Sequence, residues 1–324
     1  MFKIQRAGVT KRERGGQDHG SVSLGIQRDI YSGLSESAPK TISEKEFLKF
    51  QDLIYKEAGI WLSTVKTALL VGRLSKRLRQ LELRSFAEYY NLVAEDAEER
   101  TKMLDAISTN ETHFFREPAH FDLLQTKIFP RWEQEEAAGL RSRKIRVWSA
   151  GCSTGQEPYS LAMLLLERFP AAAGWEIEIV ATDLSTRVLE IARNGIWDFG
   201  KASEIPDKYL EAFMLRGFGE QKGKIKAAPE IRSLIRFMRL NLNEESYPVQ
   251  GPFDLVFCRN VLIYFDMHTR ERILRGLLRH RSPEGYFFVG HAESLHKMAD
   301  VIRSVIPTVY VTAAKAKREG HARR

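Results

Sequence analysis

From Lys144 onward, short apolar segments alternate with amphipathic ones, and this alternation constrains the fold more than any other feature of the chain. The apolar segments have the length and composition of buried strands: KIRVWSA, WEIEIVATDL, PFDLVFCRN, GYFFVGHAE and VIPTVYVT. Helical periodicity marks three segments that follow strands: EPYSLAMLLLERF, STRVLEIARNG and HTRERILRGLLRH. Strands that alternate with helices form a mainly parallel sheet covered on both faces. We therefore predict a doubly wound α/β domain over residues 136–314.

The alternation breaks between Phe199 and Leu242. Two segments there, GKIKAAP and SLIRFMRLNL, have the pattern of added strands. We predict that they form a small antiparallel β-subdomain at about residues 200–240.

Residues 41–135 have helical periodicity and predict a separate all-α domain. Ser43 and Glu46 form a capping-box signature at its first helix. Residues 1–40 mix Gly, Ser and charges without apolar periodicity, which favours a flexible basic tail, and residues 315–324 form a second basic tail.

The formal net charge of +8 favours acidic partners but does not choose among nucleic acid, an anionic surface and an acidic protein. No apolar run approaches the ~20 residues of a membrane span, so we expect no membrane insertion. The only cysteines, Cys152 and Cys258, are too few for a four-thiolate zinc site. We predict reduced thiols, no metal and a cytoplasmic protein.

A glycine-rich turn joins the first predicted strand to its helix in VWSAGCSTGQEPYS. Gly151 and Gly155 permit a tight turn and close approach of a ligand at the carboxyl end of the sheet. The turn lacks the lysine of a phosphate-binding loop. Glu157 either complements the helix N-terminus or meets a cationic or hydroxyl-bearing ligand. A carboxylate is unfavourable beside a pyrophosphate, so a phosphate-free cofactor fits better than NAD or ATP.

Asp183 ends the second strand. A carboxylate at this place can accept both ribose hydroxyls of a nucleoside, or it can cap the following helix. Together with the glycine turn and Glu157, it indicates an S-adenosylmethionine pocket.

Two further segments carry candidate site residues. STNETHFFREP contains polar groups interleaved with phenylalanines, and a plain connecting loop explains it equally well. In DLVFCRNVLIYF, Arg259 and Asn260 follow a buried strand and so lie at the ligand edge. Tyr264 either lines a channel for methyl transfer or packs in the core.

Taken in order, TNETHFFRE, WSAGCSTGQEPYS, ATDLS, FCRNVLIYF and GYFFVGHAESL resemble the CheR family of chemotaxis receptor methyltransferases over residues 43–313. The resemblance implies a Rossmann-like methyltransferase domain with a small antiparallel β-subdomain, preceded by an all-α domain. It also implies that S-adenosylmethionine is used to esterify glutamates of chemoreceptors. The long basic N-terminal tail is a departure from the family, and so is Gln156, where relatives often carry an acid.

The resemblance places the cofactor against both the connecting loop and the sheet edge. It implies that Glu157 faces the charged methionine moiety and Asp183 the ribose. Tyr264 is our candidate for orienting the methyl group or the substrate. The remaining implied contacts are Asn110, Thr112 and Arg116 with the methionine portion and nearby adenosine, Asn241 and Leu242 with adenine, and Arg259 with Asn260 closing the pocket.

A glutamate carboxylate is ionised near neutral pH, with a reference pKa of about 4.3, so its methylation requires no general base. Arg131 is a second candidate for attracting the substrate carboxylate. A helical stripe of basic residues offers either a solvated face or a docking surface for acidic receptor helices: Lys66, Arg73, Lys76, Arg77 and Arg84. The resemblance favours docking, through Arg73, Lys76 and Arg77.

Two other functions compete with receptor methylation. A nucleic-acid methyltransferase fits the basic charge, but the chain lacks a [DN]PP[YF] loop and a Pro-Cys nucleophile, and FCRN stands in the comparable place. An inactive module that senses the cofactor or tethers to receptors is the second alternative. We expect a monomer that binds acidic methylation helices, and in some family members the β-subdomain also binds a receptor's C-terminal peptide.

Overall fold

The computed structural model describes residues 4–6, 41–293, 295 and 301–318. Most of the predicted tail 1–40 lies outside these residues, as do positions 319–324. Ile4–Arg6 form strand β1, so the expectation of an unstructured tail is wrong at this short segment. The start of the second predicted tail is also structured. Helix α12, Ala313–Arg318, contains Lys315, which is 1% exposed and donates a hydrogen bond from Nζ to the carbonyl of Glu284.

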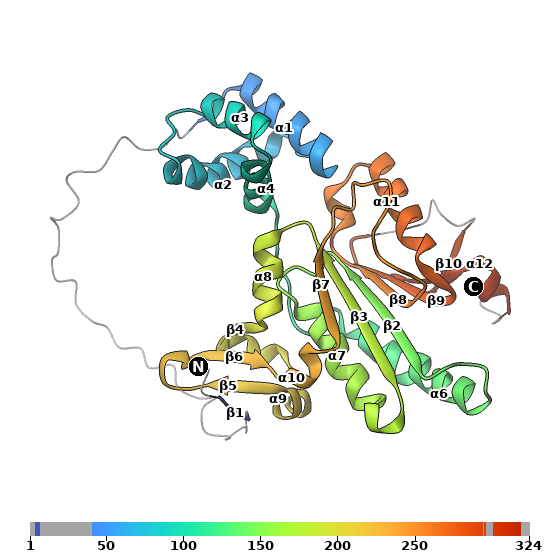
Figure 1. The fold of residues 1–324 in the computed structure, drawn as a ribbon. Helices are drawn as coiled ribbons and strands as arrows, with labels where there is room; N and C mark the ends of the chain where they lie inside the picture. Colours follow the sequence, from blue (N-terminus) through green and yellow to red (C-terminus); the bar gives the residue numbers. More distant parts are fainter. Residues whose placement is uncertain (1–3, 7–40, 294, 296–300, 319–324) are drawn as a thin grey trace.

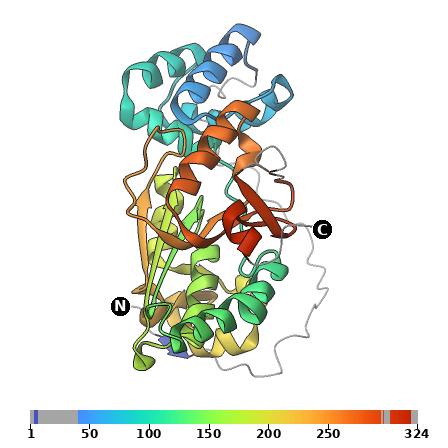
Figure 2. The same cartoon turned by 90° about the vertical axis from the view of Figure 1, so that its right-hand side faces the viewer.

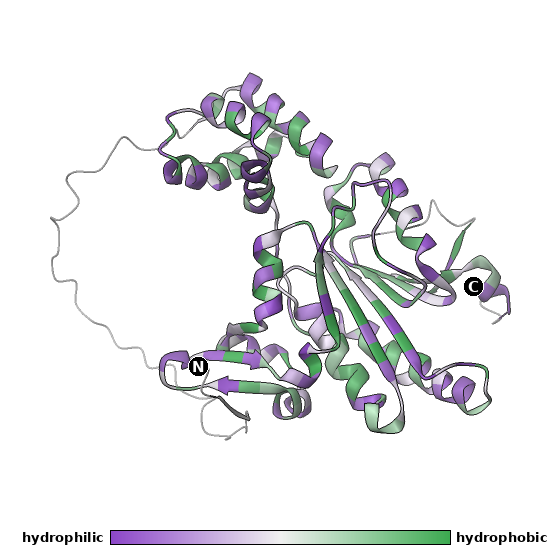
Figure 3. Ribbon diagram, in the orientation of Figure 1, coloured by the Kyte–Doolittle hydropathy of each residue, from purple (hydrophilic) through white to green (hydrophobic). Residues whose placement is uncertain are grey.

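The all-α domain lies above the large sheet in Figure 1. Its helices are α1 (Glu44–Ala58), α2 (Thr67–Gln80), α3 (Phe86–Glu95) and α4 (Ala97–Ile107), with a 3-10 turn η1 (Thr64–Lys66) before α2. The capping box of Ser43 and Glu46 is confirmed. Each helix carries both hydrophobic and hydrophilic turns in Figure 3, as amphipathic helices do. Their apolar stripes form one core, which includes Phe50, Leu74, Leu78 and Tyr89.

The large sheet has seven strands in the order β10-β11-β9-β8-β2-β3-β7. The strands are β2 (Lys144–Ala150), β3 (Glu176–Asp183), β7 (Ile235–Arg239), β8 (Phe253–Cys258), β9 (Arg281–Val289), β10 (Ile302–Ile306) and β11 (Val309–Thr312). The five strands from β7 to β9 are parallel, and β11 and β10 add antiparallel pairs. The predicted doubly wound sheet is therefore confirmed.

Helices cover both faces of this sheet. One face packs against α5 (Pro118–Leu123), the π-helical turn η2 (Leu124–Ile128), α6 (Phe129–Ala137), α7 (Gln156–Arg168) and α8 (Thr186–Asn194). The other face packs against α11 (Met267–Arg279). Because Phe121, Phe129 and Trp132 belong to the sheet's core, residues 118–137 are part of the α/β domain. The structural boundary thus falls near residue 108, not at the predicted residue 135.

The β-subdomain is a separate small sheet in the order β1-β5-β6-β4. It contains β4 (Ile196–Asp198), β5 (Met214–Gly217) and β6 (Lys224–Ala227), with helices η4 (Phe199–Glu204), α9 (Asp207–Phe213), η5 (Gly219–Gln221) and α10 (Pro229–Arg232) around it. All its strand pairs are antiparallel. The prediction that SLIRFMRLNL belongs to this subdomain is wrong: the segment forms β7 of the large sheet, which pairs parallel to β3. Because β7 is an edge strand with exposed positions, its sequence alternates polar and apolar residues. The same alternation is typical of strands in antiparallel sheets.

The predicted final strand VIPTVYVT is in fact a hairpin of β10 and β11. The turn passes through Thr308, whose φ is 69°, and the strand pattern continues on both sides of it. No helix in the described part of the chain is long and apolar enough to cross a membrane.

The all-α domain lies at one end of the α/β domain (Figure 2). The hydroxyl groups of Tyr55 on α1 and Thr269 at the start of α11 lie 3.3 Å apart. The Asp105 carboxylate on α4 accepts hydrogen bonds from the backbone N–H and hydroxyl of Thr186 on α8, at 2.9 and 2.6 Å. Ile60 forms an isolated bridge with Phe265. These contacts enclose the space above the strand tips.

Candidate active site

A cavity of about 280 Å³ lies between the all-α domain and the carboxyl ends of β2, β3 and β8. Its walls include every predicted cofactor residue and Tyr264: Asn110, Thr112, Arg116, Glu157, Asp183, Asn241, Leu242, Arg259, Asn260 and Tyr264. These residues come from segments far apart in the sequence. The structure therefore brings the whole predicted set together around one space.

The glycine turn forms the floor of the cavity after β2. Gly151 has φ 82° and Gly155 has φ 97°, a left-handed conformation that favours glycine. A Cβ at Gly151 would lie 2.3 Å from a methyl carbon of Val261. The N–H groups of Gly151 and Cys152 both donate to the carbonyl of Thr182, at 2.7 and 2.9 Å. The turn is thus fixed against the end of β3.

Two carboxylates, Glu157 and Asp183, face this floor. Glu157 accepts a 2.7 Å hydrogen bond from the Ser149 hydroxyl, and Asp183 accepts the N–H groups of Ser153 and Ser185 at 2.8 and 2.9 Å. Burial raises the pKa of both carboxyls above their ordinary values. An ionised carboxylate has about four acceptor sites, so each retains capacity for a ligand. The N-cap of α8 is Ser185 rather than Asp183, and Asp183 supports that cap by accepting the Ser185 N–H; its role at the ribose stays a prediction.

Arg259 lies behind these carboxylates. Its side chain is only 2% exposed, and its Nε is 3.4 Å from Glu117 Oε2 and 3.6 Å from Glu157 Oε2. It also donates from Nη2 to the carbonyl of Arg116. Arg259 therefore links two acidic side chains and the loop before α5.

Glu293 is a site residue that the sequence analysis did not identify, although it lies in the GHAESL motif. Its side chain is buried, and the residue is 1% exposed. Its carboxylate accepts backbone N–H groups from Asn260 at 2.8 Å, Leu262 at 2.6 Å and Gly290 at 2.6 Å. Asn260 has a φ of 60°, which is uncommon for a residue with a side chain. Glu293 thus holds the turn that presents Asn260 and Tyr264 to the cavity. The sequence feature that could have identified it is an acidic residue at the end of the predicted strand GYFFVGHAE.

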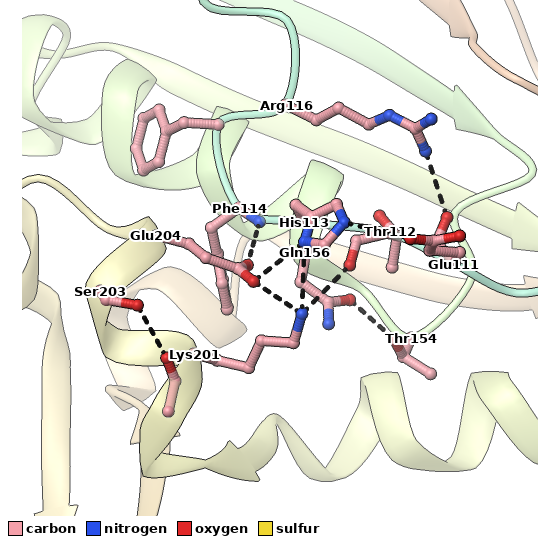
Figure 4. A network of polar contacts seen from close by, with 12 residues as sticks. Glu111, Thr112, His113, Phe114, Arg116, Thr154, Gln156, Lys201, Ser203 and Glu204 are labelled. Atoms are coloured by element: carbon pink, nitrogen blue, oxygen red, sulfur yellow. Dashed lines mark hydrogen bonds and ion pairs between the residues drawn. The ribbon is translucent and has the colours of Figure 1, made fainter. Parts of the chain in front are cut away.

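The junction loop, residues 108–117, also lines the cavity, through residues 108–113 and Arg116. Figure 4 shows the polar contacts of this loop. Phe115 and Glu117 have φ values of 51° and 59°, a conformation that side-chain-bearing residues rarely adopt and that the surroundings must hold. The Nδ2 atom of Asn110 is buried and has no hydrogen-bond partner in the protein. A buried amide without a partner on a cavity wall fits a polar ligand group.

Asn241 and Tyr264 connect the site to its neighbours. The Asn241 amide donates to the carbonyl of Glu57 at 2.7 Å and accepts the N–H of Asn243 at 3.0 Å. The amide thus holds the all-α domain as well as lining the cavity. The Tyr264 hydroxyl lies 3.5 Å from the carbonyl of Thr109, and burial raises its pKa. Tyr264 is therefore a wall residue, not part of the core.

The predicted docking residues have different surroundings. Arg77 pairs with the buried Glu99 through two hydrogen bonds, at 2.9 and 2.5 Å. Arg73 donates to the carbonyls of Ile107 and Ser108, both at 2.5 Å. Lys76 is exposed. The guanidinium groups of Arg73 and Arg77 thus form hydrogen bonds within the protein, and docking through Arg73, Lys76 and Arg77 stays a prediction.

Arg131 does not line the cavity. It lies on α6 and forms a 2.6 Å contact with Glu135 one turn later. The suggestion that it attracts the substrate carboxylate is therefore not supported. Lys66, from the same basic stripe as Arg73, does line the cavity.

The site suits one class of cofactor. The cavity combines the carboxylates of Glu157 and Asp183 with the unpaired amide of Asn110, and its glycine turn lacks a phosphate-binding lysine. Among the described residues no group of histidine, cysteine, aspartate and glutamate side chains is placed to hold a metal ion. A doubly wound sheet with Glu157 and Asp183 at one cavity defines the class of the protein: it is an S-adenosylmethionine-dependent methyltransferase.

Comparison with known sequences identifies the family. Residues 45–108 match the CheR methyltransferase all-alpha domain, and residues 110–311 match the CheR methyltransferase SAM binding domain. Chemotaxis protein methyltransferase 2 of Pseudomonas aeruginosa is 39% identical over 271 residues, covering 84% of this chain and 94% of that protein. The chemotaxis protein methyltransferase of Escherichia coli is 39% identical over 256 residues, covering 78% and 85%. The chain belongs to the CheR methyltransferase family.

Proposed function

We propose that the protein transfers a methyl group from S-adenosylmethionine to glutamate side chains of chemoreceptors, on the cytoplasmic part of the receptor, and acts as a monomer. One observation carries this conclusion. Both domains of the CheR family are present, and all ten residues expected at the cofactor and at the methyl group line a single cavity between them.

The cofactor supplies a methyl group on a positively charged sulfur. The receptor carboxylate forms the new C–O bond in line with the breaking C–S bond, and S-adenosylhomocysteine leaves. Since the carboxylate is already ionised near neutral pH, no proton has to be removed. The protein's task is to position the reactants and to exclude water.

In this proposal each wall of the cavity has a role. Glu157 meets the ammonium group of the methionine moiety, and Asp183 accepts the ribose hydroxyls. Asn110 offers its unpaired amide to the methionine carboxylate, with Thr112 and Arg116 beside it. Leu242 and Asn241 flank the adenine, and Tyr264 stands where the methyl group and the receptor carboxylate meet.

The receptor's acidic helix is proposed to bind beside the mouth of the cavity. Lys66 lines the cavity, and Lys76 is exposed on the same helical stripe. Nearby exposed apolar residues of η1, α2 and the segment after β8 are Val65, Leu69 and Ile263. Basic and apolar groups together suit an amphipathic helix with acidic residues. Arg73 and Arg77 support this surface from within.

A receptor C-terminal peptide is proposed as a second ligand, bound as an added strand of the β-subdomain. The outer edge of β5 already pairs with β1, through Ile4 with Gly217, Gln5 with Arg216 and Arg6 with Leu215. A peptide at this edge would have to displace residues 4–6.

The decisive experiment incubates the purified protein and cofactor carrying a radiolabelled methyl group with receptor membranes or with RNA. We expect label in the receptor that is released as methanol by base, because carboxyl methyl esters are base-labile. Label in RNA would identify the nucleic-acid alternative, and cofactor binding without label in either would identify an inactive module. Lys76→Ala should lower methylation at limiting receptor without weakening cofactor binding, because Lys76 is exposed and does not line the cavity. Lys144→Ala, an exposed lysine at the start of β2, is the matched control.

A further inference from the structure

The junction loop is attached to the β-subdomain through the carboxylate of Glu204. Glu204, the last residue of η4, places Oε1 at 2.9 Å from Nδ1 of His113, and its Oε2 accepts the N–H of Phe114 at 2.9 Å (Figure 4). The Glu204 side chain is 21% exposed. One side chain thus holds two consecutive residues of the loop.

Lys201 completes this attachment from the same turn. Its Nζ donates to Glu204 Oε1 at 2.7 Å and to the carbonyl of Thr112 at 3.5 Å. Partial burial alone would raise the pKa of the Glu204 carboxyl. Its hydrogen bonds with the loop and with Lys201, together with the charge of Lys201, outweigh burial and lower this pKa. Residues 112–114 are therefore held by an ionised acid and its cation.

The turn that carries these two side chains is fixed to the small sheet. The N–H of Phe199 donates to the carbonyl of Gly223, next to β6, at 2.8 Å. On the loop side, Phe114 is buried and packs edge-on against Trp197 of β4, with ring centroids 5.1 Å apart. The contacts thus run continuously from the β-subdomain to the wall of the cavity.

The loop residues on either side of this attachment face the cavity. Asn110 lies before it, Thr112 is its first residue and Arg116 lies after it, and all three line the cavity. Because Phe115 and Glu117 have left-handed backbone conformations, the loop requires tertiary contacts to keep this shape.

We propose that Lys201 and Glu204 are positioning residues for the cofactor: they hold residues 112–114 so that the junction loop presents its polar groups to the cavity. The β-subdomain then has a part in cofactor binding as well as any part in receptor binding. The inference rests on the proposed placement of the methionine portion beside the junction loop.

The test measures S-adenosylhomocysteine binding by calorimetry and methyl-transfer kinetics. Glu204→Gln and Lys201→Met are each expected to weaken product binding about three- to tenfold, since a partly exposed charge-assisted contact is lost. The cofactor KM should rise by a similar factor, while kcat at saturating cofactor stays within about twofold, because no group that touches the reacting atoms has changed. The double variant should be little worse than either single one, since all three disrupt one network.

Two further variants separate positioning from general damage. Lys201→Arg keeps the cation and its donors and should bind as the unchanged protein does. Glu178→Gln removes a carboxylate of similar exposure, 32%, which pairs with Arg146 at 2.8 Å on β2 and should leave binding unchanged. Equal affinity in Glu204→Gln and the unchanged protein, or equal weakening in Glu178→Gln, would overturn the inference. Failure of the unchanged protein to bind S-adenosylhomocysteine would instead overturn the proposed function.

Discussion

The two walls of the cavity are built in different ways. On the sheet wall, Glu157 lies in the first turn of α7, which follows β2, and Asp183 is the last residue of β3. Each accepts a hydrogen bond from a residue of its own βα unit, Ser149 and Ser185. On the junction wall, Asn110 and Arg116 belong to a loop without regular structure. That loop is held by side chains from distant segments, among them Arg73 and Glu204.

This difference distinguishes residues that contact the cofactor directly from residues that only hold the loop around it. A substitution on the sheet wall should remove a contact with the cofactor and leave the rest of the wall in place. A substitution beneath the junction wall should act at a distance, because the loop has no hydrogen-bonded ladder of its own. The predictions below test that division.

Arg259 is the point where the two walls meet, and its loss should have the largest effect. Arg259→Met leaves Glu117 and Glu157 buried without their cation. Removing one partner of a buried ionic cluster costs about 3–5 kcal/mol. Urea unfolding should show a loss of this size. The control is Arg168→Met, whose pair with Glu133 is exposed and contributes at most about 1 kcal/mol. Equal losses in both variants would show that Arg259 does not join the walls.

Asp183 tests the sheet wall alone. Asp183→Ala should weaken cofactor binding at least tenfold, since charge-assisted hydrogen bonds to the ribose contribute roughly 1.5–3 kcal/mol. Calorimetry with S-adenosylhomocysteine measures this, and Asp198→Ala, an exposed carboxylate in the β-subdomain, is the control. Unchanged affinity would rule out the ribose role.

The same division explains what could be predicted from the sequence. The sheet wall was predictable, because periodicity locates strands and polar residues at strand tips gather at one edge. The junction loop was found only through its family motif. Glu204, which holds this loop, and Glu293, which holds the turn at Asn260, were missed because their partners lie 90 and 33 positions away in the sequence. The internal contacts of Arg73 and Arg77 were missed for a related reason: a helical stripe shows which residues share a face, not what packs against it.

A pH titration distinguishes the charge of the sheet wall from its shape. Burial raises the pKa of Glu157 and of Asp183, so both protonate at higher pH than ordinary carboxyls do. As the pH falls through these raised values, the cationic cofactor loses its partners and its Kd should rise, by up to about tenfold per pH unit for one proton. Glu157→Gln should bind more weakly at pH 7 and show a flatter profile. Parallel profiles in the two proteins would assign the dependence to another group.

The smallest effect concerns how far the support of the junction wall extends. Ile4→Pro/Gln5→Pro in the full chain should prevent β1 from pairing with β5, since proline cannot donate to a strand ladder. The probe is a labelled peptide of residues 1–10, followed by fluorescence anisotropy. It should bind this variant about two- to threefold more tightly than the unchanged chain, in which residues 4–6 already compete at the edge. So small a gain is expected because pairing of only three residues is marginally stable.

The control peptide carries proline at the same two positions and should bind neither protein. The cofactor Kd should change less than about twofold, because β1 pairs with β5 whereas Lys201 and Glu204 lie on η4, which is attached next to β6. Equal peptide binding to both proteins would show that β1 does not occupy the edge in solution. A larger change in cofactor affinity would mean that the support of the junction wall extends across the small sheet to its outermost strand, β1. Residues far from the cavity would then belong to the support of the binding wall.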